Sequence, residues 1–202
     1  LWSEQNPNDW YTGMTSCIEA LGKRNDLKTI LSVGFSGQMH GATLLDENND
    51  IIRPAILWND GRCAQECMEI EQKVERAREI TGNIIMPGFT APKLLWLKNH
   101  EPESFAKVSK VLLPKDYLRF KLTGDHASDM SDSAGTCWLD VQARDWNDEM
   151  LAVCGLNQSH MPKLFEGSDI TGTLKADLAN DWGMNQVPVV AGAGDNAAGA
   201  IG

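Results

Sequence analysis

The chain has 202 residues, of which 42% are hydrophobic and 23% charged, a balance typical of soluble globular proteins and unlike that of disordered or collagen-like chains. Its 28 Asp and Glu outnumber its 18 Lys and Arg, and the net charge of −10 excludes a basic nucleic-acid-binding surface. No apolar stretch reaches the roughly 20 residues that span a bilayer, and no secretory signal opens the sequence, so we expect a cytoplasmic protein with neither nucleic acid nor membrane as a partner.

Two helices are predicted in the first half of the sequence. Asn6 and Pro7 precede apolar residues at helical spacing that end at Gly22, the pattern of an amphipathic helix. The charged stretch over residues 60–80 predicts a single solvent-facing helix, which ends at Thr81 and Gly82.

Short apolar runs bounded by turn residues predict strands. They cover residues 30–35, 42–45, 51–56, 111–113, 138–141, 170–174 and 187–191. The second and third of these runs flank a turn-rich segment and indicate an antiparallel hairpin. Further helices are expected over residues 92–99, 102–107, 116–122, 146–154 and 176–182. The alternation predicts a mixed α/β fold.

The end of the sequence indicates a longer parent. The strand 187–191 runs into a glycine-rich turn and a helix that has barely begun at Gly202, and the sequence opens without a Met. We therefore expect a fragment of a longer enzyme.

Asp195 is the main candidate for catalysis. A strand, a glycine turn and a helix start hold a side chain over the carboxyl edge of a sheet, where open α/β folds bind ligands, and a carboxylate there could accept a proton. An ordinary helix cap explains Asp195 equally well. Gly192, Gly194 and Ala197 also match the spacing of a dinucleotide-binding turn, which leaves an NAD-dependent oxidoreductase as an alternative.

Two polar segments are candidate sugar-binding loops. Gln38 and His40 follow the first buried strand and offer amide and imidazole groups to sugar hydroxyls, although a structural His fits as well. Trp58 beside Asp60 provides an aromatic face and a carboxylate, although Asp60 could instead cap the following helix. A non-catalytic carbohydrate-binding module is therefore the second alternative.

The metal-binding side chains do not form a site in the sequence. Five scattered Cys residues predict reduced thiols rather than a disulfide framework. Cys63 and Cys67 share a helix face without a nearby His, which excludes zinc. His100, His126 and His160 are isolated, and we assign them no role.

Five segments, in order along the chain, carry a resemblance to a known family. They are Ser36-Gly37-Gln38-Met39-His40-Gly41, Leu57-Trp58-Asn59-Asp60-Gly61-Arg62, Leu113-Pro114-Lys115-Asp116-Tyr117-Leu118, Ser128-Asp129-Met130-Ser131-Asp132 and Ala193-Gly194-Asp195-Asn196-Ala197. Together they resemble the FGGY carbohydrate kinases, most closely the members that act on xylulose. The likeness covers essentially all 202 residues.

The resemblance implies an actin-like, ribonuclease H-like α/β domain, with a mixed sheet and helices on both faces, that is incomplete at both ends. It implies transfer of the γ-phosphoryl group of ATP, with Mg²⁺, to the 5-hydroxyl of D-xylulose or a related ketose or polyol. Asp195 falls on the position of the catalytic base, with Mg²⁺ nearby but no residue assigned as a direct metal ligand. Met39 and His40 fall on the substrate-binding pair, and Asn196 is similar to an amide that touches the sugar.

The sequence also departs from the family pattern. The Asp-x-Gly-Thr phosphate hairpin and the second, ATP-holding domain are absent, so residues 1–202 correspond to part of the N-terminal, substrate-binding domain. We expect no ATP or Mg²⁺ bound to this fragment, which alone should be inactive and a weak sugar binder. Gly88 stands where some relatives carry a Tyr or Arg near the substrate. A homodimer is left open.

Overall fold

The computed structural model describes residues 2–202. The helices are α1 Pro7–Gly22, α2 Ala64–Lys73, α3 Ala77–Thr81, α4 Thr90–His100, α5 Pro102–Phe105, α6 Pro114–Thr123, α7 Met130–Ser133, α8 Asp148–Val153, α9 Ala176–Trp182 and α10 Asp195–Ile201. The strands are β1 Glu4–Gln5, β2 Ser36–Gly37, β3 Thr43–Leu45, β4 Ala55–Ile56, β5 Lys110–Leu112, β6 Ala127–Asp129, β7 Leu139–Asp140, β8 Asp145–Trp146, β9 Lys163–Phe165, β10 Ile170–Thr173, β11 Pro188–Val190 and β12 Ala193–Gly194.

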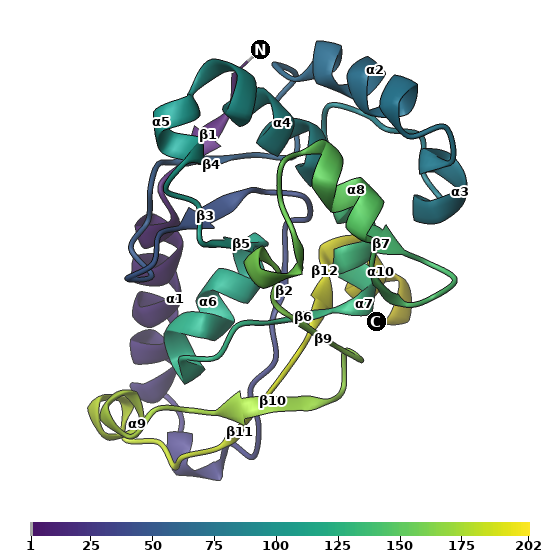
Figure 1. Ribbon diagram of the computed structural model, residues 1–202. Helices are drawn as coiled ribbons and strands as arrows, with labels where there is room; N and C mark the ends of the chain where they lie inside the picture. Colours follow the sequence, from purple (N-terminus) through teal and green to yellow (C-terminus); the bar gives the residue numbers. More distant parts are fainter. Residues whose placement is uncertain (1) are drawn as a thin grey trace.

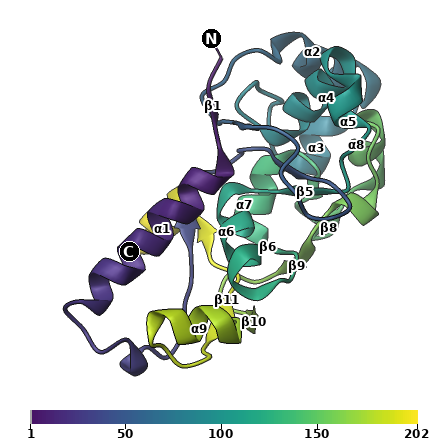
Figure 2. The same cartoon turned by 90° about the vertical axis from the view of Figure 1, so that its left-hand side faces the viewer.

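The strands associate in pairs. Antiparallel pairs join β1 with β4, β3 with β5, β7 with β8 and β10 with β11, whereas β2 with β12 and β6 with β9 are parallel. α1 and α9 pack at one end of the molecule, and α2, α3, α4, α5 and α8 gather at the other (Figures 1 and 2). The mixed α/β class is confirmed, with strands in small units between helices.

The main hydrophobic core lies under the second group of helices. It includes Ile70 of α2, Leu95 of α4, Leu151 of α8 and the fully buried Trp138. A smaller core around Leu174 packs under α9. No helix within residues 2–202 is long and apolar enough to cross a membrane.

Helix α1 confirms the first prediction. The Asn6 side chain accepts a hydrogen bond from the N–H of Asn8, Pro7 is the first helical residue, and the helix ends at Gly22. Asn6 thereby satisfies one of the free N–H groups at the helix start, and Pro7 needs no partner there.

The strand predicted over residues 30–35 is wrong. Only Val33 pairs, by a parallel bridge to Val189, and Leu31 is 84% exposed. The segment meets β11 at this one point, where the Val33 N–H donates to Pro188 and the Val33 carbonyl accepts from Val190. The regular strand begins only at Ser36.

The single helix predicted over residues 60–80 is also wrong, because the chain breaks it into α2 and α3. Val74 between them is buried and extended, with φ −121° and ψ 91°. Ile70 before this turn and Ile80 after it both lie in the main core. The helical region ends at Thr81 as predicted, before Gly82 with φ +67°.

The predicted antiparallel hairpin is confirmed, but isolated bridges rather than a continuous ladder join its two sides. Leu45 of β3 bridges Ile51, and Ala42 bridges Ile56 of β4, both antiparallel. β3 also pairs with β5, so the hairpin is held in the interior rather than at an edge.

Candidate functional site

A cavity of about 160 Å³ lies between the loop that follows β2 and the first turn of α10. Its lining residues are Met39, His40, Trp58, Asp195 and Asn196. All five are residues that the sequence singles out, and they come from three distant segments of the chain. The structure therefore brings the two strongest candidate regions to one place.

The parallel pairing of β2 with β12 creates this meeting point. Ser36 pairs with Ala193 and Gly37 with Gly194, so both strands end at the same edge and their following residues emerge side by side. Figure 1 shows β2 and β12 adjacent, with α10 beginning directly after β12. Because the carboxyl edge of parallel strands is where α/β folds bind ligands, this position suits a substrate site.

Two glycines of the β12 turn are required by close packing. Gly192 has φ +83°, and a Cβ there would lie 2.1 Å from the carbonyl oxygen of Phe35. A Cβ on Gly194 would lie 2.9 Å from Cγ of Met39. The glycine spacing thus has a structural cause that involves no dinucleotide. Ala197, the third member of that pattern, lines a separate hollow of about 1000 Å³ rather than the small cavity.

Asp195 is the first residue of α10 and is exposed. Its Oδ1 accepts a hydrogen bond of 2.9 Å from the N–H of Asn196, and Gly194 occupies the cap position. The carboxylate is therefore free to face a ligand in the cavity, and Asn196 presents its amide beside it. Such a pair can accept a proton and orient a hydroxyl.

His40 forms the opposite wall of the cavity. Its Nδ1 lies 2.9 Å from the carbonyl oxygen of Gly135, and its ring packs edge-on against Phe89 with centroids 4.7 Å apart. Burial lowers the pKa of His40 to about 4, although the hydrogen bond to Gly135 opposes the shift. The ring is therefore neutral at physiological pH and acts as a hydrogen-bonding group.

Trp58 and Asp60 separate in the structure. Trp58 is 55% exposed and lines the cavity. Asp60 is buried away from it, accepting from the Arg62 side chain at 2.6 Å and from the N–H of Ser3 at 2.6 Å. Burial favours a higher pKa for Asp60, but these donors outweigh burial and hold it below its usual value. Asp60 ties the N-terminal segment to the loop and does not cap α2, which begins after Cys63.

Gln38 also lies outside the cavity lining. Its Nε2 donates to Oε1 of Gln5 at 3.2 Å, which links the loop after β2 to β1. This contact gives Gln38 a role in holding the loop.

A buried ionic network lies directly behind the β2–β12 pair. Nζ of Lys115 is 2.6 Å from Asp116, 2.7 Å from Asp129 and 3.6 Å from Asp132. Burial raises the pKa of Asp132 well above its usual value, although the nearby Lys115 opposes the shift. Although burial opposes the charge on Lys115, the three carboxyl groups raise its pKa above the usual range.

Within residues 2–202, no group of three or more His, Cys, Asp or Glu side chains could hold a metal ion. Cys63 and Cys67 are buried free thiols, as the sequence predicts. Their positions in the main core agree with packing.

The sequence reasoning missed several residues that contact His40, and two of them bear directly on its position. One is Gly135, whose carbonyl faces the His40 ring, and the other is Lys93, whose ammonium group donates to the His40 backbone carbonyl at 2.8 Å. The lysine within the apolar run of α4 was a usable signal, because a charged residue on a buried helix face needs a specific partner.

Comparisons with known proteins agree with the resemblance. The model of the FGGY family of carbohydrate kinases, N-terminal domain, matches residues 1–202. The chain is 60% identical over its whole length to a xylulose kinase of Escherichia coli and 41% identical to one of Bacillus subtilis, and it covers 42% and 41% of these proteins.

The solved structures point to the same relatives. A crystal structure described as a xyloylose kinase from Brucella ovis matches 98% of this chain, and 41% of its own length, with a TM-score of 0.94 and 52% identity. Ligand-bound xylulose kinase from Lactobacillus acidophilus matches 99% of this chain and 41% of its own length, with a TM-score of 0.91 and 25% identity. The chain thus spans about two fifths of the length of the relatives it matches.

Proposed function

The chain belongs to the FGGY family of carbohydrate kinases, and we propose that it carries the sugar-binding part of the active site of an ATP-dependent kinase. The sugar is D-xylulose, and the accepting group is its 5-hydroxyl. The relatives at 60% and 41% identity are xylulose kinases, which supports this choice of substrate.

One observation supports the proposal above the others. The cavity of about 160 Å³ joins Asp195 and Asn196, from the end of the chain, to Met39, His40 and Trp58 from its first third. A proton-accepting carboxylate, hydroxyl-binding groups and an aromatic face suit a site that binds a sugar and deprotonates one of its hydroxyl groups.

Asp195 is the proposed base. As the 5-hydroxyl attacks the γ-phosphorus, an Asp195 oxygen accepts its proton, and the bond from the γ-phosphorus to the bridging oxygen of ADP breaks, so that ADP leaves with the bonding electron pair. ATP with Mg²⁺ supplies the phosphoryl group. The exposed carboxylate of Asp195 provides hard oxygen atoms of the kind Mg²⁺ prefers, so this residue fits a position near the ion. Phosphoryl transfer depends mainly on positioning and charge neutralisation, so a carboxylate is a sufficient base.

The remaining cavity residues hold the sugar. His40 and Asn196 offer hydrogen bonds to hydroxyl groups, and Met39 closes the side next to Gly194. The exposed ring of Trp58 offers an apolar face to the C–H groups of a sugar. Asn196 follows the base directly, so it can bind a hydroxyl next to the one that reacts.

The test is an ADP-release assay on the full-length gene product with ATP, Mg²⁺ and a panel of ketoses and polyols. Asp195→Asn removes the base with little change in volume, and we expect kcat to fall at least about a hundredfold. Asp177→Asn is the matched control, because Asp177 is also an exposed Asp in the first turn of a helix, α9, outside the cavity. Retained kcat in Asp195→Asn contradicts the proposed base, and a preference for another sugar contradicts the proposed substrate.

A further inference from the structure

Lys93 is a buried lysine of α4 without a carboxylate partner in the described part of the chain. Its exposure is 0%, and its Nζ donates to the carbonyl oxygen of His40 at 2.8 Å and to that of Gly88 at 2.7 Å. Lys115, the other deeply buried lysine, is surrounded by three carboxyl groups. Burying an ammonium group is costly unless hydrogen bonds satisfy it, so the two carbonyl contacts are what retain Lys93 in this position.

The first carbonyl belongs to a residue in an unfavourable backbone conformation. His40 has φ +66°, a left-handed geometry that is unfavourable for a residue with a side chain. Such a conformation persists only where neighbouring groups hold it. Here the Lys93 ammonium and the Thr90 hydroxyl, at 3.1 Å, both donate to the His40 carbonyl.

The second carbonyl connects Lys93 to the aromatic wall of the cavity. Gly88 packs so closely on Trp58 that a Cβ on it would lie 2.8 Å from the Trp58 carbonyl oxygen. One ammonium group thus fixes the backbones next to both His40 and Trp58. This arrangement also accounts for a glycine at position 88, where a Tyr or Arg side chain has no space.

The orientation of the His40 ring is set by Gly135. A carbonyl oxygen can only accept, so the 2.9 Å contact between Nδ1 and Gly135 requires the proton on Nδ1. The neutral ring then has an unprotonated Nε2, which has no hydrogen-bond partner among residues 2–202. A Cβ on Gly135 would lie 2.3 Å from Cε1 and 2.5 Å from Nδ1 of His40, so only glycine permits this ring position.

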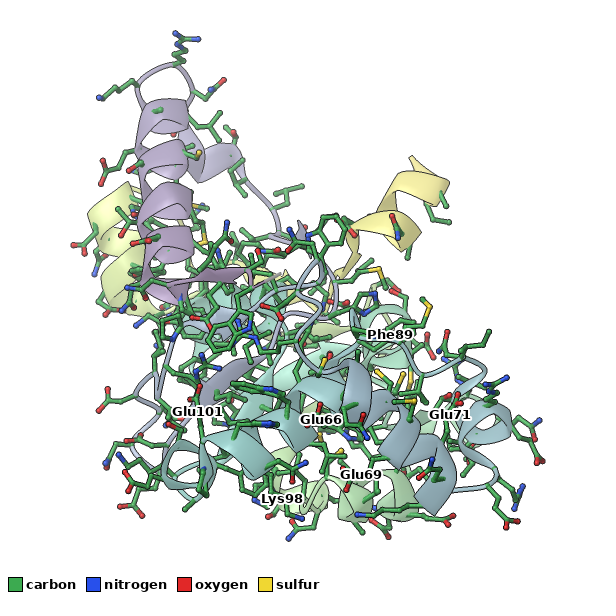
Figure 3. All side chains as sticks on the ribbon, turned by 90° about the horizontal axis from the view of Figure 1, so that it is seen from above. Glu66, Glu69, Glu71, Phe89, Lys98 and Glu101 are labelled. Carbon is green, nitrogen blue, oxygen red and sulfur yellow. The ribbon has the colours of Figure 1, made fainter. Side chains whose placement is uncertain are left out.

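Phe89 completes the support of the ring. It precedes α4, is labelled in Figure 3, and meets the His40 ring nearly perpendicularly at 87°. The charged groups that face His40 from the packed elements are Lys93 on α4, which opposes protonation, and Asp195 on α10, which favours it.

We infer that Lys93 and Gly135 are positioning residues of the sugar site, which together hold His40 so that its Nε2 accepts a hydrogen bond from a sugar hydroxyl. The inference rests on the proposed function for the identity of the ligand. Lys93 and Gly135 have different roles in this inference. Lys93 fixes the backbone of His40, and Gly135 fixes the tautomer and the position of the His40 ring. The site accordingly favours ligands that present an O–H group at this position over ligands that present a carbonyl.

The kinetic test uses the full-length gene product with saturating ATP and varied D-xylulose. We expect Lys93→Met and Gly135→Ala each to raise KM for the sugar about tenfold or more, with kcat within about threefold of the wild type, because the lost contact binds ground and transition states alike. Lys98→Met is the control for Lys93, since Lys98 lies exposed on the same helix (Figure 3). Gly13→Ala is the control for Gly135, since a Cβ there meets nothing within 4 Å. An unchanged KM in folded Lys93→Met and Gly135→Ala overturns the inference.

A pH profile separates positioning from a general loss of structure. In the wild type we expect KM to stay constant from pH 6.5 to about 5.5, since burial lowers the pKa of His40 to about 4 and that of Lys93 to about 7, so neither pKa lies in this range. In Gly135→Ala the displaced ring regains solvent, and KM should rise as the pH falls below the ordinary histidine pKa of about 6.5. The same flat profile in both proteins contradicts the role of Gly135.

NMR spectroscopy tests the tautomer of His40 without depending on catalysis. In protein labelled with ¹⁵N-histidine, and with His40→Gln used for assignment, we expect His40 to show the neutral Nδ1–H tautomer down to about pH 5. Observation of the Nε2–H tautomer overturns the inference even if the enzyme is active. If the wild type turns over no sugar at all, the proposed function fails, but the NMR measurement still shows whether His40 has the tautomer that the inference requires. If Lys93→Met does not fold, Lys93→Gln, which keeps an N–H donor, takes its place.

Discussion

Gly192→Ala tests whether the pairing of β2 with β12 builds the cavity. A Cβ at this position would lie 2.1 Å from the Phe35 carbonyl oxygen and 3.1 Å from its carbonyl carbon, both backbone atoms that cannot rotate away. Reaching an ordinary contact of 3.4 Å requires the chain near Phe35 to move by more than about 1 Å. That displacement breaks the hydrogen bond from the Ala193 N–H to Phe35, now 3.0 Å, and strains the one from Val190 to Val33, now 2.9 Å.

The expected cost follows from these changes. Alanine at φ +83° costs about 1–2 kcal/mol and the broken backbone hydrogen bond about 1 kcal/mol, so the domain should lose about 2–3 kcal/mol of stability. For a domain of this size that lowers Tm by about 4–12 °C. Since β12 carries Asp195 and β2 leads to His40, the same shift should also raise the sugar KM at temperatures where the variant is folded.

Thermal unfolding by circular dichroism and the ADP-release assay measure the two effects on the full-length gene product. Gly199→Ala is the control, because Gly199 lies in α10 and a Cβ there meets nothing within 4 Å. A Gly192→Ala protein with wild-type Tm and wild-type KM refutes the reasoning. A lower Tm with an unchanged KM refutes only the link between this strand pair and the sugar site.

Three further predictions concern other parts of the site. His40→Ala should raise the sugar KM more than it lowers kcat, measured by ADP release; unchanged kinetics would make His40 a purely structural residue. Because Asp60 has a pKa below its usual value, its pairing stabilises the fold above about pH 4 and is lost as the pH falls through the folded-state pKa. Urea unfolding of Arg62→Met should therefore show a weaker acid dependence than the wild type, whereas Arg24→Met should not, since Arg24 is exposed and forms no ion pair among residues 2–202. The 202-residue chain alone should release no ADP with D-xylulose and ATP, in contrast to the full-length gene product, and turnover by the short chain would contradict the need for residues outside it.

Local patterns predicted the helices better than the strands. The helix start at Asn6 and Pro7 and the stops at Gly22 and Gly82 depend on a few neighbouring residues, so the sequence shows them directly. The break at Val74 depends on a core that distant segments build, and periodicity alone cannot reveal it. The strand over residues 30–35 failed for a similar reason, because only tertiary pairing decides whether an apolar run becomes regular.

In the candidate site, too, the sequence indicated residues in short local motifs but not contacts between distant positions. Asp195, Met39 and His40 stand in short motifs, and the structure places all three around one cavity. Gly135 contacts His40 from 95 positions away, and nothing in its local sequence indicates that partner. Asp60 stood beside Trp58 in a motif that suggested sugar binding, but its carboxylate is occupied by Arg62.

The β2–β12 pair that organises the cavity is only two residues long on each side, too short to hold its register by backbone hydrogen bonds alone. The ionic network behind it supplies the missing constraint. A Cβ on Gly37 would meet Cβ of Lys115 at 3.2 Å, and one on Gly194 would meet Oδ1 of Asp132 at 3.1 Å, so each strand rests on one member of the network. Because the buried Lys115 and its carboxyl partners hold each other in place, they fix both strands relative to one another. The precision of the cavity that Asp195 and His40 line therefore depends on buried charges that do not line it.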